Sequence, residues 1–267
     1  MGAPPIKGLL LDLSGTLYVG TAAVEGARDA VKALTAAGYP LLYVTNTTSK
    51  PRSAVVEKLA SMGFAITPEE VLTAPLAGAE GLLARGHTRC QFLLPEPVLA
   101  DLPGMTHDAA EPEAVVVGDI GEAFDYGILN RAFRNIMEGA SLYALAKNRY
   151  FTDDNGLRLD VGPFVRALEY AADTRAELLG KPAAAFFLAA AAKLGLPPGS
   201  VAMVGDDIEG DVGGAIAAGM RGILVRTGKY RRAAAEAAEI TPDADLASVA
   251  ALPDFLATGQ SRAPEPD

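Results

Sequence analysis

The sequence predicts an α/β fold, in which a doubly wound, mainly parallel core carries a smaller α/β domain inserted into it. Short apolar segments alternate with helical patterns along most of the chain, and this alternation is typical of βαβ units. Several apolar segments end in an acidic or hydroxyl residue, and open α/β sheets bind ligands at the carboxyl ends of their strands. With 267 residues, the chain can form one large domain or two modest ones.

The two ends of the chain supply the core. We expect strands at Gly8–Leu11, Leu41–Thr45, Val201–Val204 and Gly222–Val225, and helices at Gly26–Ala36, Pro51–Ser61 and Pro182–Lys193. Pro51 suits the first turn of its helix, and Gly63 suits the C-terminal cap of the same helix. Gly195 closes the alanine-rich third helix in the same way.

The middle of the chain repeats the pattern by itself. We expect strands at Gln91–Leu94, Ala114–Val117, Ser141–Leu145 and Ala176–Leu179, and helices at Tyr126–Met137 and Gly162–Ala171. We therefore predict a discontinuous core of residues 1–74 and 179–260, interrupted by an inserted α/β domain of residues 75–178. The polar, proline-containing residues 261–267 are expected to form a disordered tail.

The composition argues against several classes of function. The formal net charge is −10, whereas binding to a phosphate backbone needs basic patches, so we expect no nucleic-acid partner. No apolar run approaches the roughly 20 residues that span a membrane, so we expect no membrane partner. The start of the chain lacks the layout of a secretory signal, and the single cysteine, Cys90, fits a reducing compartment. We expect a cytoplasmic protein.

Four groups of polar residues stand at the carboxyl ends of expected strands. They are Asp12 in Asp12–Leu17, Thr45 followed by Asn46, Lys181 in Leu179–Pro182, and the acidic loop Gly205–Asp211. A buried strand that brings a carboxylate to its tip, followed by a glycine turn, presents a nucleophile or a metal ligand. Each group alone occurs often by chance, but all four in this order form a specific signal.

This set resembles the haloacid dehalogenase (HAD) superfamily of phosphatases over nearly the whole chain. The motifs match in order, and the inserted domain is similar to the large α/β cap that lies between the second and third motifs of such proteins. The resemblance implies a Rossmann-like core, a cap over the strand ends that selects the substrate, and an aspartyl-phosphate intermediate. Caps of this type often mediate dimers, so the resemblance is compatible with a homodimer.

Other segments resemble a narrower group within the superfamily, the phospholysine phosphohistidine inorganic pyrophosphate phosphatases and their relatives. The segments are Val117–Asp119, Phe124–Tyr126, Lys147–Tyr150 and Thr227–Tyr230. This group also has serine at the position of Ser14.

The resemblance implies a role for each catalytic residue. Asp12 would attack phosphorus, Thr45 would donate its hydroxyl to the transferring phosphoryl group, and Lys181 would neutralise charge beside both. Mg²⁺ favours oxygen ligands, which would be Asp12, Asp206 and the backbone carbonyl of Ser14. The carbonyl is present with any side chain, so serine at position 14 leaves the metal site intact.

Substrate contacts are expected from Asn46 and from Asn148 in the inserted domain. The neighbouring cations Lys147 and Arg149 would grip the remote part of a substrate, or they are solvated surface charges. A large cap favours small phosphorylated compounds, although a protruding phosphorylated side chain of a protein would also fit.

Three further aspartates have two interpretations each. Asp211 holds Lys181 or a metal-bound water, or caps a helix, since carboxylates favour that position. Asp207 assists the metal through water, or only shapes the turn. Asp119 follows an apolar strand of the inserted domain and would form a rival acidic site, but it lacks a matching lysine and threonine. We therefore interpret it as a structural residue or a residue of the cap near the cleft, and not as a metal ligand.

Ser14 limits the substrates that can be cleaved. Phosphatases of this superfamily usually have a second aspartate there, which protonates the leaving oxygen, and such acid–base help is typically worth about 10²–10⁴ in rate. A serine hydroxyl titrates too high for that role. Leaving groups that need little protonation should suffer least, as in pyrophosphate, P–N bonds and aryl phosphates.

We therefore expect a Mg²⁺-dependent phosphohydrolase that favours such substrates. The alternative is a catalytically weak or inactive phosphate-binding or regulatory protein, because Ser14 removes the general acid. A dehalogenase-like enzyme that attacks carbon is a third class, but it needs no metal, and the acidic loop Asp206–Asp211 argues against it.

Overall fold

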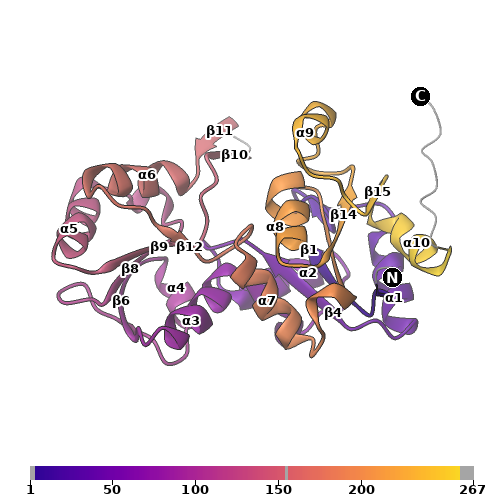
Figure 1. Ribbon diagram of the computed structural model, residues 1–267, viewed down its shortest axis with the longest axis horizontal. Coiled ribbons are helices and arrows are strands. Elements are labelled where there is room, and N and C mark those ends of the chain that lie inside the picture. The colour runs from indigo at the N-terminus through magenta and orange to yellow at the C-terminus, as the bar shows by residue number, and fades with distance from the viewer. Residues whose placement is uncertain (1–3, 154–155, 259–267) are drawn as a thin grey trace. The chain divides into compact units, whose positions relative to one another are not determined.

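The computed structural model describes residues 4–153 and 156–258 (Figure 1). The chain forms two compact units. The first consists of Met1–Thr45, Val56–Leu72 and Lys181–Asp267, and the second of Asn46–Val55 and Thr73–Gly180. The expected tail, residues 261–267, lies outside the described residues. None of the helices described is both long and apolar enough to cross a membrane.

The first unit is built on a six-stranded sheet with the order β15-β14-β13-β1-β4-β5. Its strands are β1 (Gly8–Asp12), β4 (Leu41–Thr45), β5 (Val71–Thr73), β13 (Val201–Gly205), β14 (Arg221–Val225) and β15 (Ala244–Leu246). The neighbours from β15 to β4 all pair in parallel. Every residue of β1, β4 and β13 is buried, which is typical of parallel strands covered on both faces.

Helices and a short hairpin complete the first unit. They are α1 (Ala27–Ala36), α2 (Arg52–Ser61, continuing from the second unit), α7 (Ala184–Lys193), α8 (Gly214–Ala217), α9 (Arg232–Ala237), α10 (Leu252–Thr258) and the hairpin β2 (Tyr18–Val19) with β3 (Ala22–Ala23). Helix α1 buries Ala27, Ala30, Val31 and Leu34, the spacing of one helical face. It lies beside α10 (Figure 1).

The second unit contains a parallel five-stranded sheet with the order β12-β9-β8-β6-β7. Its strands are β6 (Arg89–Leu93), β7 (Thr106–His107), β8 (Ala114–Val117), β9 (Ser141–Ala144) and β12 (Glu177–Leu178), and its helices are α3 (Ala74–Ala84), α4 (Glu96–Leu99), α5 (Tyr126–Met137) and α6 (Gly162–Ala171). The antiparallel hairpin β10 (Tyr150–Asp153) and β11 (Gly156–Leu159) precedes α6.

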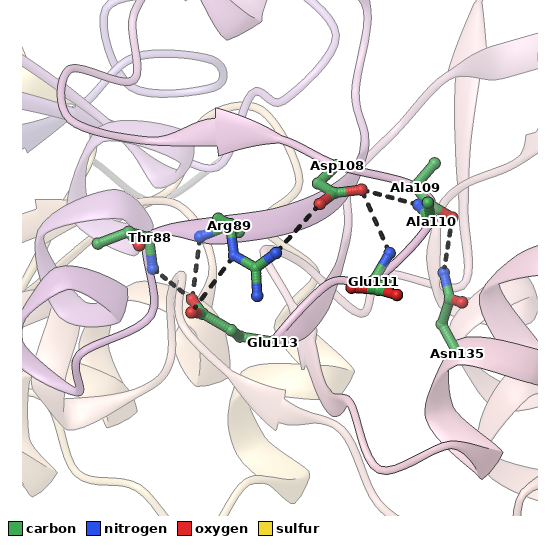
Figure 2. Close-up of polar contacts among 8 residues, drawn as sticks. All are labelled: Thr88, Arg89, Asp108, Ala109, Ala110, Glu111, Glu113 and Asn135. Carbon is green, nitrogen blue, oxygen red and sulfur yellow. Dashed lines mark hydrogen bonds and ion pairs between the residues drawn. The ribbon is translucent and has the colours of Figure 1, made fainter.

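A network of charged side chains ties the β6–β7 edge to the loop before β8 (Figure 2). The carboxylate of Glu113 accepts the backbone N–H groups of Thr88 and Arg89, at 2.7 and 3.0 Å. The guanidinium of Arg89 in turn reaches Asp108 at 3.5 Å. Asn135 of α5 donates to the carbonyl of Ala109 in the same loop. The Glu113 carboxylate therefore satisfies two backbone N–H groups at the start of β6.

The Rossmann-like α/β fold with parallel sheets is confirmed. The expected helices Tyr126–Met137 and Gly162–Ala171 match α5 and α6, and the helix expected from Pro182 begins at Ala184. Helix α3 was not expected from the sequence. Apart from Glu80 its sequence is apolar, on the exposed face that carries Leu83 as well as on the buried face that carries Leu82, so no amphipathic period marks it.

Candidate active site

Three neighbouring strands bring polar residues to one edge of the core sheet. Asp12 ends β1, Thr45 ends β4, and Asp206 directly follows β13. The register aligns them, because Leu11 pairs with Val204 and Asp12 pairs with Val44. Parallel strands end at the same edge of their sheet, so the sequence positions at these three strand ends become neighbours in space.

Lys181 joins two of the carboxylates. Its Nζ donates to Oδ1 of Asp12 at 2.5 Å and to Oδ1 of Asp211 at 2.6 Å. All three side chains are buried. Asp211 lies in the helical turn Ile208–Gly213 after β13, and Gly205 makes room for it, because a Cβ on Gly205 would overlap the Asp211 carboxylate.

Asp206 sits between two glycine loops. Its Oδ2 accepts the backbone N–H of Lys229 at 2.5 Å. A Cβ on Gly15, whose φ is +98°, or on Gly228 would overlap this same oxygen. Thr227 closes the arrangement, since its hydroxyl donates to the carbonyl of Gly15. The carboxylate position therefore depends on small residues in both loops.

Burial dominates the electrostatics of the cluster. It raises the pKa of Asp12, against the opposing effect of Lys181, and raises the pKa values of Asp206 and Asp211 to about 6. For Lys181, burial lowers the pKa, but the carboxylates of Asp12 and Asp211 outweigh it and the net shift is upward. The ammonium therefore stays charged, while the carboxyls are costly to ionise together.

The donor set fits a hard divalent cation. Carboxylate oxygens of Asp12, Asp206 and Asp211 lie within 4.8 Å of one another, and Mg²⁺ prefers oxygen ligands from one or two carboxylates together with waters and substrate phosphate. Lys181 offsets one negative charge of the three. A divalent cation would supply the positive charge that this buried cluster still needs.

Comparison with known proteins agrees with this geometry. Residues 9–103 match the family described as Haloacid dehalogenase-like hydrolase, and residues 178–252 match the HAD-hydrolase-like family. The bovine (Bos taurus) Haloacid dehalogenase-like hydrolase domain-containing protein 2 is 46% identical over 85% of this chain and 87% of its own length. The chain belongs to the haloacid dehalogenase-like hydrolase family.

Other members of this family are named for phosphatase activities. Phospholysine phosphohistidine inorganic pyrophosphate phosphatase of Xenopus laevis is 38% identical over 96% of both chains. Among solved structures, 4-nitrophenylphosphatase of Thermotoga maritima superposes with a TM-score of 0.88 and 27% identity, covering 94% of this chain and 97% of its own. This HAD-like hydrolase is a phosphatase of the superfamily.

Several residues singled out from the sequence have a definite environment in this HAD-like chain. Oδ1 of Asp207 accepts the backbone N–H groups of Glu209 and Gly210, at 3.1 and 2.8 Å, so its carboxylate shapes the turn. Asp211 contacts Lys181, as described above. Ser14 is exposed directly after the buried Leu13.

The remaining expected contacts belong to the second unit. Asn46 and Asn148 both lie in it, and Asn148 is exposed, with its carbonyl accepting the N–H of Gly162. The ammonium of Lys147 forms an ion pair with the buried carboxylate of Glu169 at 2.6 Å. It is therefore more than a solvated surface charge, and part of its charge is already balanced within the chain. Oδ1 of Asp119 accepts the backbone N–H of Gly121, in keeping with a structural role.

Sequence reasoning missed the contact of the loop Thr227–Lys229 with the acidic cluster. The available signal was the position of this loop directly after β14, the neighbour of β13. Tyr18 was missed as well. Burial, with a smaller effect of the Asp12 charge, raises the pKa of Tyr18 to about 12, so the Tyr18 hydroxyl stays protonated.

The charge imbalance predicts that Mg²⁺ stabilises the folded protein. At 100 times its Kd, a bound ion adds about 2.7 kcal/mol, or roughly 5–10 °C in Tm for a chain of this size. Asp206→Asn should raise the Tm of the metal-free protein, because a costly buried carboxyl is removed, and should abolish most of the Mg²⁺ shift.

Thermal unfolding with EDTA or with Mg²⁺ measures both effects. Asp245→Asn is the matched control, because Asp245 of β15 is a carboxylate that pairs with Arg226 outside the cluster. This variant should keep the full increase in Tm on adding Mg²⁺. An unchanged Tm of the wild type on adding Mg²⁺ would contradict the assignment of the cluster as a cation site.

Proposed function

We propose that this chain is a Mg²⁺-dependent phosphohydrolase in which Asp12 is the nucleophile. The observation that carries the proposal is the arrangement around Lys181, whose ammonium contacts Asp12 and Asp211 while the carboxylate of Asp206 lies beside them. A buried carboxylate held by a permanent positive charge at a strand end is oriented for attack. Small phosphorylated compounds are the substrates we propose.

The proposed reaction has two steps. An oxygen of Asp12 forms a bond to phosphorus, and the bond between phosphorus and the leaving group breaks, with the electron pair going to the leaving group. Water then attacks the phosphorus of the aspartyl-phosphate, which releases inorganic phosphate and restores Asp12. Lys181 keeps Asp12 in place and, with the hydroxyl of Thr45, balances charge on the transferring group.

We propose Asp12, Asp206 and the backbone carbonyl of Ser14 as the protein ligands of the cation. When bound, Mg²⁺ would neutralise phosphoryl oxygens and position them for in-line displacement. Asp211 is then a positioning residue for Lys181, because its Oδ1 already accepts a hydrogen bond from that ammonium.

Ser14 sets the proposed substrate preference. It lies two residues after Asp12 and cannot protonate a leaving oxygen near neutral pH. P–N bonds, pyrophosphate and aryl phosphates release leaving groups that need little such help. Two similar proteins support the same classes. One is named for phospholysine, phosphohistidine and pyrophosphate, and the other is a 4-nitrophenylphosphatase.

The first prediction from this mechanism concerns the nucleophile. Asp12→Asn should reduce p-nitrophenyl phosphate hydrolysis below detection, because an amide is a poor nucleophile of nearly the same size. Release of p-nitrophenol measures activity, and circular dichroism checks that the variant is folded. Activity of folded Asp12→Asn close to that of the wild type would show that another group attacks phosphorus.

The second prediction concerns position 14. Ser14→Asp should raise kcat/KM for a hexose phosphate by about 10²-fold, the lower end of typical acid–base assistance. It should change pyrophosphate and imidodiphosphate hydrolysis much less. Ser14→Asn is the matched control, because asparagine has the size of aspartate but no carboxyl group that could donate a proton. Equal effects of the two variants, or a wild-type preference for the hexose phosphate, would contradict the leaving-group argument.

A further inference from the structure

The loop Thr227–Lys229 packs directly against the proposed nucleophile loop. The Thr227 hydroxyl donates to the carbonyl of Gly15, and Gly228 has a φ of +58° and is so close to Gly15 that a Cβ would overlap its Cα. The backbone N–H of Lys229 completes these contacts through its 2.5 Å bond to Asp206. The Lys229 side chain therefore starts at a Cα that is bonded to the N–H in contact with the acidic cluster.

Lys229 is exposed, and its ammonium group has no partner among the residues that the structure describes. Within residues 4–153 and 156–258, it has no ion pair and no hydrogen bond, and the side chain is exposed to solvent. Its charge still acts on the cluster. Burial raises the pKa values of Asp12 and Asp206, and the positive charge of Lys229 opposes that rise in both. Lys229 is thus a cation at the solvent side of the carboxylates.

Lys229 and Lys181 are not equivalent. Lys181 is buried, and its ammonium forms ion pairs with two carboxylates of the protein, those of Asp12 and Asp211. Lys229 follows β14, which lies beyond β13, whereas Thr45 ends β4 on the other side of β1. The sheet order therefore places Lys229 and Thr45 on opposite flanks of Asp12. In the function proposed above, the Thr45 flank binds the transferred phosphoryl group, and the Lys229 flank carries an exposed positive charge.

We propose that Lys229 binds the distal phosphate of a diphosphate substrate, the group that leaves when Asp12 attacks the other phosphorus. This inference rests on the function proposed above and adds a residue that determines specificity for pyrophosphate-like compounds. The exposed ammonium and its loop provide the site, and the ligand is the dianionic end of inorganic pyrophosphate or imidodiphosphate.

The chemistry accounts for both Lys229 and Ser14. When the bridging P–O bond breaks, the departing phosphate takes the electron pair and gains negative charge. The ammonium of Lys229 stabilises that charge by a charge-assisted hydrogen bond and keeps its proton. A leaving phosphate helped by a cation needs no general acid at position 14, whereas a leaving alkoxide still does.

The test uses competition during p-nitrophenyl phosphate hydrolysis by the full-length protein at fixed free Mg²⁺. Inorganic pyrophosphate and orthophosphate are the two inhibitors. Lys229→Met should raise the Ki of pyrophosphate about tenfold, the size expected for one charge-assisted contact, and the Ki of orthophosphate by a clearly smaller factor. The hydrogen bond to Asp206 comes from the backbone N–H of residue 229, so Lys229→Met keeps it. If the loop had only a structural role, the variant would change the Ki values of the two inhibitors by the same factor.

Two further variants complete the experiment. Lys229→Arg keeps the charge and should give a Ki for pyrophosphate close to that of the wild type. Lys32→Met removes an exposed lysine of α1, whose charged neighbour is Asp29, and should leave both Ki values unchanged. Equal changes for the two inhibitors, or none, would overturn the assignment of Lys229 while the proposed phosphatase function stands. A wild type without any p-nitrophenyl phosphate hydrolysis would overturn both.

Discussion

The site depends on one constraint, the burial of three carboxylates around a single ammonium group. Asp12, Asp206 and Asp211 are held within 4.8 Å of one another, and Lys181 is the buried cation that contacts two of them. Breaking a buried ion pair by removing one partner typically costs about 3–5 kcal/mol. Such a cluster is therefore held in place but keeps excess negative charge. That charge favours binding of a divalent cation, and a bound cation could in turn hold a phosphate.

The sheet and a few glycines maintain that constraint. Parallel pairing of β1 with β4 and β13 places the strand ends side by side, and no side-chain interaction is needed to align them. The close approach of the loops is then limited by side-chain volume. At Gly15 and Gly228 a Cβ would overlap the Asp206 carboxylate, and at Gly205 it would overlap that of Asp211. Substitution of any of these glycines would displace a carboxylate of the cluster.

Much of this arrangement could be predicted from the sequence, because strand ends are marked by a change from apolar to polar residues. That signal located Asp12, Thr45, Lys181 and Asp206, and the order of the four motifs related them to one site. Spacing alone could not separate Asp207 from Asp211. The turn Ile208–Gly213 directs one carboxylate to the backbone and the other to Lys181, and this difference arises from tertiary structure. Helix α3 was missed for a different reason, since apolar residues such as Leu83 on its exposed face remove the amphipathic period.

The roles proposed for Ser14 and Lys229 correspond to two physical ways to stabilise a leaving group. A proton is needed when charge develops on a single strongly basic oxygen, as in a departing alkoxide. A fixed positive charge suffices when the charge is spread over several phosphate oxygens, because Coulomb attraction then acts without proton transfer. In the proposed mechanism, serine at position 14 removes the first option, and the ammonium of Lys229, a residue exposed to solvent, offers the second. The same nucleophile and buried lysine can therefore serve different substrates, with selectivity decided by the groups around the leaving atom.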